Sequence, residues 1–222
     1  MRSWVVSFHP LASTSGGLQS ILQHNLRPFI DGSCRSEPDL LALFPSVSGL
    51  CRERYFVPRV HVGDEILYVT VKRHYGLPRA HHRLIAHLRV IEEFESHDLA
   101  AYWYEVICGL RIPSNCMVSG SQPIPLDRTH RRLTELRRTD PERRLAAWDR
   151  GYWLRAESVP KFLACKRIFS ATRNPPPIFE EDWLETLGYV PSTQTPTDHD
   201  LDEVRELVRR ARAKRRPSVF RS

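Results

Sequence analysis

The sequence predicts an α+β protein, on the evidence of two strand-like runs and one helix-like run. Residues 66–71 and 84–91 are apolar, rich in β-branched side chains and shorter than most helices, so we expect two buried strands that pair with each other. From Ser96 the apolar residues recur every three to four positions, which predicts a helix over 96–108. The face that should pack on the sheet carries Leu99, Trp103, Ile107 and Leu110.

The remaining elements follow from local patterns along the chain. Residues 4–8 alternate and contain β-branched side chains, which predicts a first strand. Leucine and isoleucine at helical spacing from Leu18 predict a helix that ends before Pro28. Residues 30–40 lie between prolines and are crowded with polar side chains, so we expect an irregular loop.

The second half of the chain is predicted to be mainly helical. Asp140-Pro141 favours a helix start, because proline suits the first helical turn. Residues 158–169 are expected to form a further helical segment, and the three prolines at 175–177 an extended linker. Two amphipathic helices should follow, the first carrying Trp183, Leu184, Leu187 and Tyr189, the second Leu201, Val204, Val208 and Ala211.

Composition and length indicate one main core with extensions. The chain has 222 residues, of which 41% are hydrophobic. We expect a domain over 1–126, a helical extension packed on it over 127–190, and a linker with a basic helical tail over 191–222. No secretory segment and no apolar run of about 20 residues is present, so a soluble, cytoplasmic protein without membrane contact is expected. Five irregularly spaced cysteines are expected to be reduced.

The net charge of +7 is concentrated near the C-terminus. Residues 209–222 contain seven Lys or Arg and no acid, which leaves 26 bases and 26 acids in the rest of the chain. Residues 128–144 hold a second local excess, with seven arginines against three acids. Either segment could bind a nucleic-acid backbone, and a frayed, solvated tail is the alternative for the first.

An ordered series of short motifs supports a more specific interpretation. Val62-Gly63-Asp64 precedes a strand with Tyr68-Val69-Thr70, a second strand contains Arg89-Val90-Ile91-Glu92, and the segment 96–104 follows, with polar segments 31–39 and 48–52 upstream. This series resembles the PUA-like superfamily, which includes PUA, ASCH, EVE and YTH domains. It is most similar to the nucleotide modification associated domains.

The resemblance covers residues 4–126 and implies a fold and a function. The fold would be a PUA-like small mixed β-barrel with flanking helices and a helical C-terminal extension. Its pocket would hold a nucleobase of DNA or RNA, often a modified one, in a protein associated with nucleic-acid modification or with phage and anti-phage biology. No aromatic triad of the YTH kind is evident, so a cage for a methylated base is not supported.

The candidate site residues combine base-edge donors and acceptors, stacking rings and phosphate-binding cations. The candidates for base binding are Asp31, Ser33, Cys34, Arg35, Thr70, Tyr75, Trp103, Ser114 and Asn115. Those for phosphate binding are Arg52, Lys72, Arg73 and Arg79. The alternative is that these residues make turn hydrogen bonds, surface ion pairs and core contacts.

Catalysis, metal binding and protein binding remain as competing interpretations. The chain lacks the common hydrolase, nucleotide-binding and deaminase motifs, so we expect a binding protein without a cofactor rather than an enzyme. No close pair of cysteines indicates zinc. An ASCH-like nucleoside hydrolase would use Thr70, Lys72 and Glu92 or Glu93, another enzyme would use Cys34 or Cys116 with a histidine, and a protein-interaction module would use the C-terminal helix.

Overall fold

The protein is built on one mixed sheet, as described by a computed structural model for residues 1–50, 52–131 and 140–214. Its seven strands run in the order β2-β5-β4-β3-β1-β7, with β6 paired to one end of β4. Strands β1 and β3 are parallel and all other pairs are antiparallel. The edge strands β2 and β7 do not pair with each other, so the described sheet is open and the expected closed barrel is not seen.

Each of the three segments expected from the sequence, 1–126, 127–190 and 191–222, contributes strands. Their bounds are Ser3–Phe8 (β1), Ser46–Ser48 (β2), Glu65–Thr70 (β3), His82–Phe94 (β4), Phe162–Ser170 (β5), Pro177–Ile178 (β6) and Asp198–His199 (β7). Residues 1–126 therefore supply β1 to β4, and the two later segments complete the same sheet.

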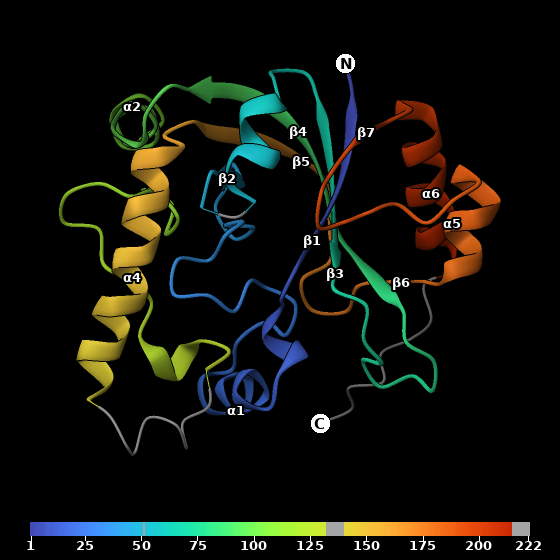
Figure 1. The fold of residues 1–222 in the computed structure, drawn as a ribbon, viewed down its shortest axis with the longest axis horizontal. Coiled ribbons are helices and arrows are strands. Elements are labelled where there is room, and N and C mark those ends of the chain that lie inside the picture. The colour runs from blue at the N-terminus through green and yellow to red at the C-terminus, as the bar shows by residue number, and fades with distance from the viewer. Residues whose placement is uncertain (51, 132–139, 215–222) are drawn as a thin grey trace.

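The helices lie on both sides of this sheet (Figure 1). They are Ser15–His24 (α1), His97–Tyr102 (α2), Pro141–Ser158 (α4), Glu180–Leu187 (α5) and Leu201–Ala213 (α6). A π-helical turn, Trp103–Ile107, extends α2, and short 3-10 turns occupy Leu11–Ser13, Glu53–Tyr55, Val57–Arg59 and Leu126–Arg128.

An apolar layer lies on each face of the sheet, between the strands and the helices or loops that cover them. On one face, Val5, Leu67 and Val69 pack against Trp183 of α5 and Leu207 of α6. The other face contributes residues such as Trp4 and Ile66 to a core closed by the loops between β1 and β3. Figure 1 shows α5 and α6 on one side of the strands, with α2 and α4 on the other.

Several sequence predictions are confirmed. The first strand and the two central strands form, and β3 pairs with β4 in antiparallel register. Residues 30–40 are irregular, and Asp140 caps α4, accepting a hydrogen bond from the Glu142 backbone at 3.0 Å. Val204, Val208 and Ala211 are buried on α6 as expected, whereas Leu184 and Tyr189 are about half exposed.

Two sequence predictions are wrong. Residues 158–169 were expected to be helical, but they contain most of β5, which lies between β4 and β2 in the sheet. In the 96–108 helix, Leu99 and Ile107 are exposed, and Ala100 and Tyr104 are buried instead. The π-helical turn at Trp103–Ile107 breaks the 3.6-residue period on which that prediction depended.

Within the described residues, no helix is both long enough and apolar enough to cross a membrane.

The contact between α6 and the sheet predicts a stability effect. Leu207 is fully buried against that face, so Leu207→Ala should lower the free energy of unfolding by about 2–5 kcal/mol through lost burial and a residual cavity. Leu22→Ala on α1 is the matched control, because Leu22 is 86% exposed and its truncation should change stability by less than about 0.5 kcal/mol. Urea unfolding of both variants tests this, and equal effects would contradict the packing described.

Candidate functional site

A group of polar side chains meets where the parallel strands β1 and β3 end. Pro10, just after β1, forms an isolated bridge with Asp31, and the Gly32 amide donates to the His9 carbonyl at 3.2 Å. The polar loop 31–40 therefore begins beside the end of β1. Every residue of that loop is buried, although it contains no regular secondary structure.

Asp31 and Ser33 lie at the start of this loop. One oxygen of Asp31, Oδ1, accepts hydrogen bonds from the backbone amides of Ser33 (2.8 Å) and Glu37 (3.1 Å). Burial raises the pKa of Asp31 to about 6, despite these hydrogen bonds, which act to lower it. The side chain can therefore be protonated or ionised near neutral pH, and can donate or accept accordingly.

Tyr152 reaches the same place from α4. Its pKa is raised by burial and by the charge of Asp31, and a hydrogen bond with Ser33 acts in the opposite direction. The hydroxyl groups of Tyr152 and Ser33 thus lie beside the Asp31 carboxyl group. Each hydroxyl can donate and accept, so the three side chains form a versatile set of hydrogen-bonding groups.

Two arginines and two histidines complete the group. Arg52 Nη2 donates to the Ser7 carbonyl at 2.9 Å, while Arg52 Nε is buried and has no hydrogen-bond partner among the described atoms. Desolvation and then the charges of Arg73 and Arg52 lower the pKa of His9, so both arginines lie near it. The His130 amide donates to the Gly32 carbonyl at 2.8 Å, and its buried Nδ1 has no partner in the described structure.

We refer to these residues as the β1-end cluster. Its members are His9, Asp31, Ser33, Arg52, Arg73, His130 and Tyr152. Four of them were candidates from the sequence. The other three were not, because Tyr152 and His130 come from segments about 100 residues distant and His9 has no motif around it.

Four other predicted base-binding residues take part in a separate buried network. Cys34 is fully buried, and Arg35 pairs through Nη2 with the Asp149 carboxylate at 2.7 Å. Ser114 donates to Asp39 at 2.8 Å, and Asn115 Nδ2 donates to Glu37 at 2.8 Å. These groups hold the 31–40 loop in place, so their hydrogen-bonding capacity is largely used within the protein.

Glu37 is the centre of that network. It accepts from the Ser48 amide at 3.1 Å and from the Ser48 hydroxyl and the Asn115 amide group. Burial raises the pKa of Glu37 to about 8 in spite of these bonds. The side chain is therefore mainly protonated at neutral pH.

The aromatic and hydroxyl candidates lie elsewhere. Thr70 Oγ1 accepts from the Arg83 amide at 3.0 Å, and the Tyr75 hydroxyl donates to the Val71 carbonyl at 2.9 Å. Tyr75 packs against Phe29 and His81. Trp103 lies between Phe44 and Phe94 in a different apolar group.

The remaining phosphate candidates are joined to α5. Lys72 pairs with Glu180 at 2.9 Å, and Arg79 pairs with Glu181, all four side chains being about half exposed. Exposed pairs of this kind exchange readily with other ligands, because they contribute little stability. The expected basic stretch 128–144 falls partly outside the described residues, and Cys51 and the tail beyond residue 214 lie wholly outside them.

Cys34 and Cys116 do not have the environment of nucleophiles. Burial is the first cause that raises the pKa of Cys34 and of Cys116 to about 12, so both thiols stay protonated at neutral pH. Cys116 Sγ donates to the His97 carbonyl at 3.2 Å rather than to the imidazole ring. Among the described residues, no group of three or more His, Cys, Asp or Glu side chains is arranged to hold a metal ion.

Comparison with known proteins leaves the family open. No protein-family model matches the chain. No curated protein matches it in sequence either.

The buried carboxyl group of Glu37 predicts a dependence of stability on pH. Because its pKa is about 8 in the folded state and about 4.5 unfolded, the folded chain binds the extra proton between these values. The contribution of Glu37 to the free energy of unfolding should fall as pH rises from about 5 to about 8, by up to about 1.4 kcal/mol per pH unit, whereas His97 and His130, whose pKa values burial lowers to about 4, contribute with the opposite sign below about pH 6.5. Asp31 adds an effect of the same sign as Glu37 below about pH 6.

Glu37→Gln should remove the Glu37 contribution, giving a flatter profile between pH 6 and 8. The measurement is urea unfolding at pH 5, 6, 7 and 8. Glu92→Gln, which alters an exposed carboxyl group of β4, is the control and should keep the wild-type slope. A Glu37→Gln profile parallel to the wild type would show that Glu37 is ionised in the folded protein.

Proposed function

We propose that the chain binds a nucleobase of DNA or RNA, commonly a modified one, at the β1-end cluster, and that it acts as a binding protein rather than a catalyst. The observation that carries the proposal is that Asp31 and Ser33 lie at the end of β1, where the charges of Arg52 and Arg73 act on His9. Two of these residues suit a base edge and two suit a phosphate.

The chemistry of the cluster supports recognition of a base edge. Asp31 can accept from an exocyclic amine or a ring N–H when ionised, and can donate when protonated. Tyr152 and Ser33 offer hydroxyl groups beside it. Arg52 Nε and His130 Nδ1 are buried polar atoms without partners in the described structure, and a bound base would satisfy them.

The fold is compatible with the family suggested by the motifs. We propose that the open sheet, with its parallel β1 and β3, is a PUA-like sheet whose barrel is incomplete on the β2 and β7 sides. In this arrangement the segments that follow β1, β2 and β3 supply five of the seven members of the β1-end cluster, and His130 and Tyr152 come from later segments. A polar site on loops supported by a rigid sheet is a frequent arrangement for ligand binding.

The alternative of a nucleoside hydrolase receives less support. Lys72 is paired with Glu180, and Glu93 is paired with Lys161 at 3.0 Å. Thr70 accepts a backbone hydrogen bond from Arg83. The three side chains thus have separate partners and do not form one catalytic group.

The test is binding of the full chain to single- and double-stranded DNA and RNA, with and without common base modifications. Asp31→Asn keeps a side-chain oxygen for the Ser33 and Glu37 amides but removes the carboxylate. Tyr152→Phe removes one hydroxyl group and leaves Asp31 intact. Each variant should reduce the preference for the favoured base by about tenfold or more, since one base contact is worth about 1–3 kcal/mol.

Arg73→Ala should behave differently from the base-site variants. Loss of one phosphate contact should weaken binding to all sequences equally and lower the salt dependence by about one unit of slope. Arg173→Ala, another exposed arginine, is the matched control and should bind like the wild type. If the wild type shows no base preference, or if Asp31→Asn and Tyr152→Phe both retain it, base recognition at this cluster is refuted.

A further inference from the structure

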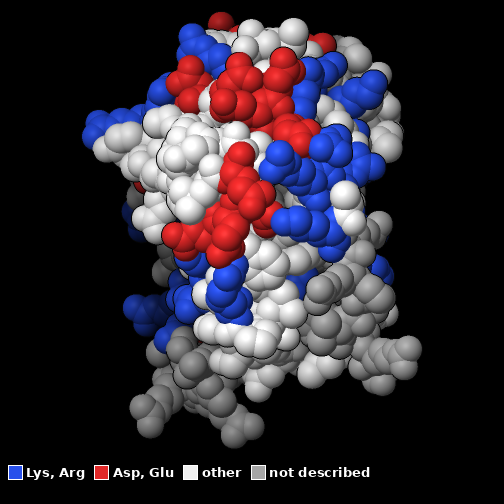
Figure 2. Space-filling model, turned by 90° about the vertical axis from the view of Figure 1, so that its right-hand side faces the viewer, with Lys and Arg blue, Asp and Glu red and all other residues white. Residues whose placement is uncertain are grey.

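A groove of about 830 Å³ lies between α6 and the strands β4 and β5, away from the β1-end cluster. Its lining is strongly basic, with Arg89 from β4, Lys166 and Arg167 from β5, and Arg205, Arg209 and Arg212 from α6. Figure 2 shows the face that carries α5 and α6, where basic side chains gather beside a band of acidic ones.

The positive charge of the groove is only partly compensated within the protein. The acid in its lining is Glu65, while Glu206 and Asp202 pair with Arg209 and Arg205 near the rim. Six basic side chains therefore face three carboxylates. Four of the six cations, Arg89, Lys166, Arg167 and Arg205, come from the part of the chain before residue 209, where bases and acids are equal in number.

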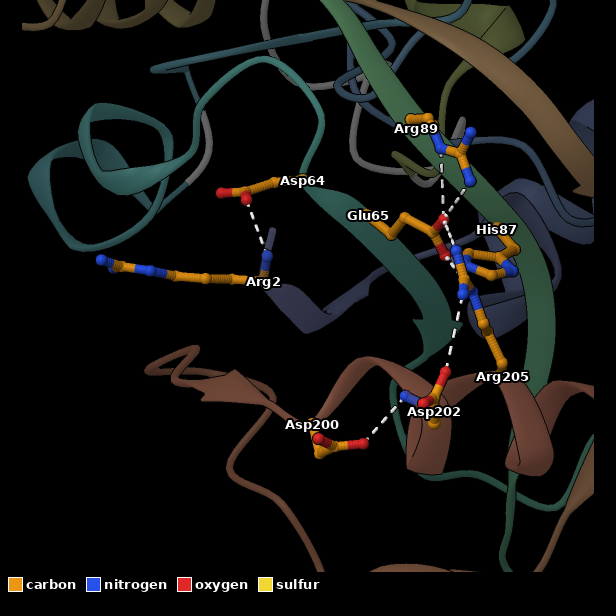
Figure 3. Close-up of polar contacts among 8 residues, drawn as sticks. All are labelled: Arg2, Asp64, Glu65, His87, Arg89, Asp200, Asp202 and Arg205. Carbon is orange, nitrogen blue, oxygen red and sulfur yellow. Dashed lines mark hydrogen bonds and ion pairs between the residues drawn. The ribbon is translucent and has the colours of Figure 1, made fainter.

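Glu65 fixes two of the arginines at the base of the groove (Figure 3). Its carboxylate is fully buried, and Arg89 Nη2 and Arg205 Nη2 donate to Oε1 at 2.7 and 2.8 Å. His87 Nε2 lies 2.6 Å from Oε2. Although burial acts to raise the pKa of Glu65, the hydrogen bonds from Arg205 and Arg89 lower it to about 2, so one negative charge is shared by two guanidinium groups.

Both of these arginines remain accessible. The Arg89 and Arg205 side chains are 43% and 42% exposed, so part of each guanidinium group faces the groove. Being held by a buried carboxylate, they lose little conformational entropy when a second anion binds. This arrangement gives the groove two pre-positioned cations.

Three further cations have no carboxylate partner among the described residues. Lys166 is exposed and makes no ion pair there, and Arg167 donates to the backbone carbonyls of Leu40 and Ala42. Arg212 stacks on Phe169, with its guanidinium carbon 5.3 Å from the ring centroid. Phe169 and its neighbour Ile168 add an apolar surface that suits the faces of bases.

We infer that this groove binds the phosphate backbone of a nucleic acid, independently of base sequence. Phosphates match the excess of guanidinium and ammonium groups, and the adjoining apolar surface favours a strand with exposed bases. The inference deepens the proposed function, since it assumes the same class of ligand. The groove and the β1-end cluster share no residue, so the proposal for each can be refuted separately.

The experiment compares two double variants of equal net charge in the full chain. Lys166→Ala with Arg212→Ala removes two of the three groove cations that have no carboxylate partner among the described residues, whereas the control, Arg111→Ala with Arg150→Ala, removes two exposed cations that do not line the groove. Affinity for a single-stranded oligonucleotide of mixed sequence is measured at 50 and 200 mM salt. Thermal unfolding of each variant checks that the fold is retained.

The groove variant should bind about tenfold or more weakly at 50 mM salt. The slope of log K against log salt should fall by about 1.4, because two phosphate contacts are lost on a single strand. The control variant should keep the wild-type affinity and slope. Any base preference shown by the wild type should persist in the groove variant, since the β1-end cluster is intact.

Three results would overturn the inference. The two double variants could lose affinity equally, which would indicate a general effect of net charge. The groove variant could bind the oligonucleotide like the wild type. It could also lose binding of a nucleoside triphosphate while retaining the oligonucleotide, which would assign the groove to a small nucleotide. If the wild type shows no base preference and the groove variant loses salt-dependent binding, the groove inference is supported and the proposed function is refuted.

Discussion

The ion pair between Arg35 and Asp149 is the interaction on which the position of the candidate site depends. The Arg35 side chain is fully buried, and a buried guanidinium group without a partner would cost several kcal/mol. Asp149 is the partner, so α4 must pack against the 31–40 loop with this residue facing inward. Tyr152 follows three residues later on the same face of α4, which brings its hydroxyl group to Asp31 and Ser33. A structural charge pair thus positions a side chain of the β1-end cluster.

The second constraint is the protonated state of Glu37. Its carboxyl group joins the 31–40 loop to Ser48 of β2, 11 residues along the chain, and to Asn115, 78 residues along the chain. An ionised group in that fully buried position would be costly, and protonation avoids most of the cost. The loop is irregular, yet side chains satisfy many of its backbone groups, as when Asp31 accepts from two amides. A loop held in this way can present Asp31 and Ser33 with a fixed geometry.

The sequence was most informative where local physics decides the structure. The β-branched runs of β3 and β4 and the Asp140-Pro141 start of α4 could be identified without tertiary information. Strand β5 could not, because Lys166 and Arg167 interrupt its apolar residues and Phe162, Cys165 and Phe169 imitate a helical period. Pairing with β2 and β4 overrides that local pattern. The buried face of the 96–108 helix was misassigned because a single π-helical turn is not visible in the periodicity.

For the candidate sites, the sequence indicated which residue types could bind a ligand, but not what surrounds each side chain in the fold. Asp31 and Arg35 stand four residues apart in one polar loop, yet the guanidinium group of Arg35 pairs with Asp149, whereas Asp31 accepts from the Ser33 and Glu37 amides of its own loop. The two side chains differ because α4, which lies more than 100 residues away in sequence, supplies a carboxylate partner to Arg35. The basic groove shows the same limitation, since the excess of arginine near the C-terminus was evident but Arg89 and Lys166 join it only through the sheet. Cations that lie far apart in the sequence form one basic groove when a helix with arginines at 205, 209 and 212 lies across two strands that carry more.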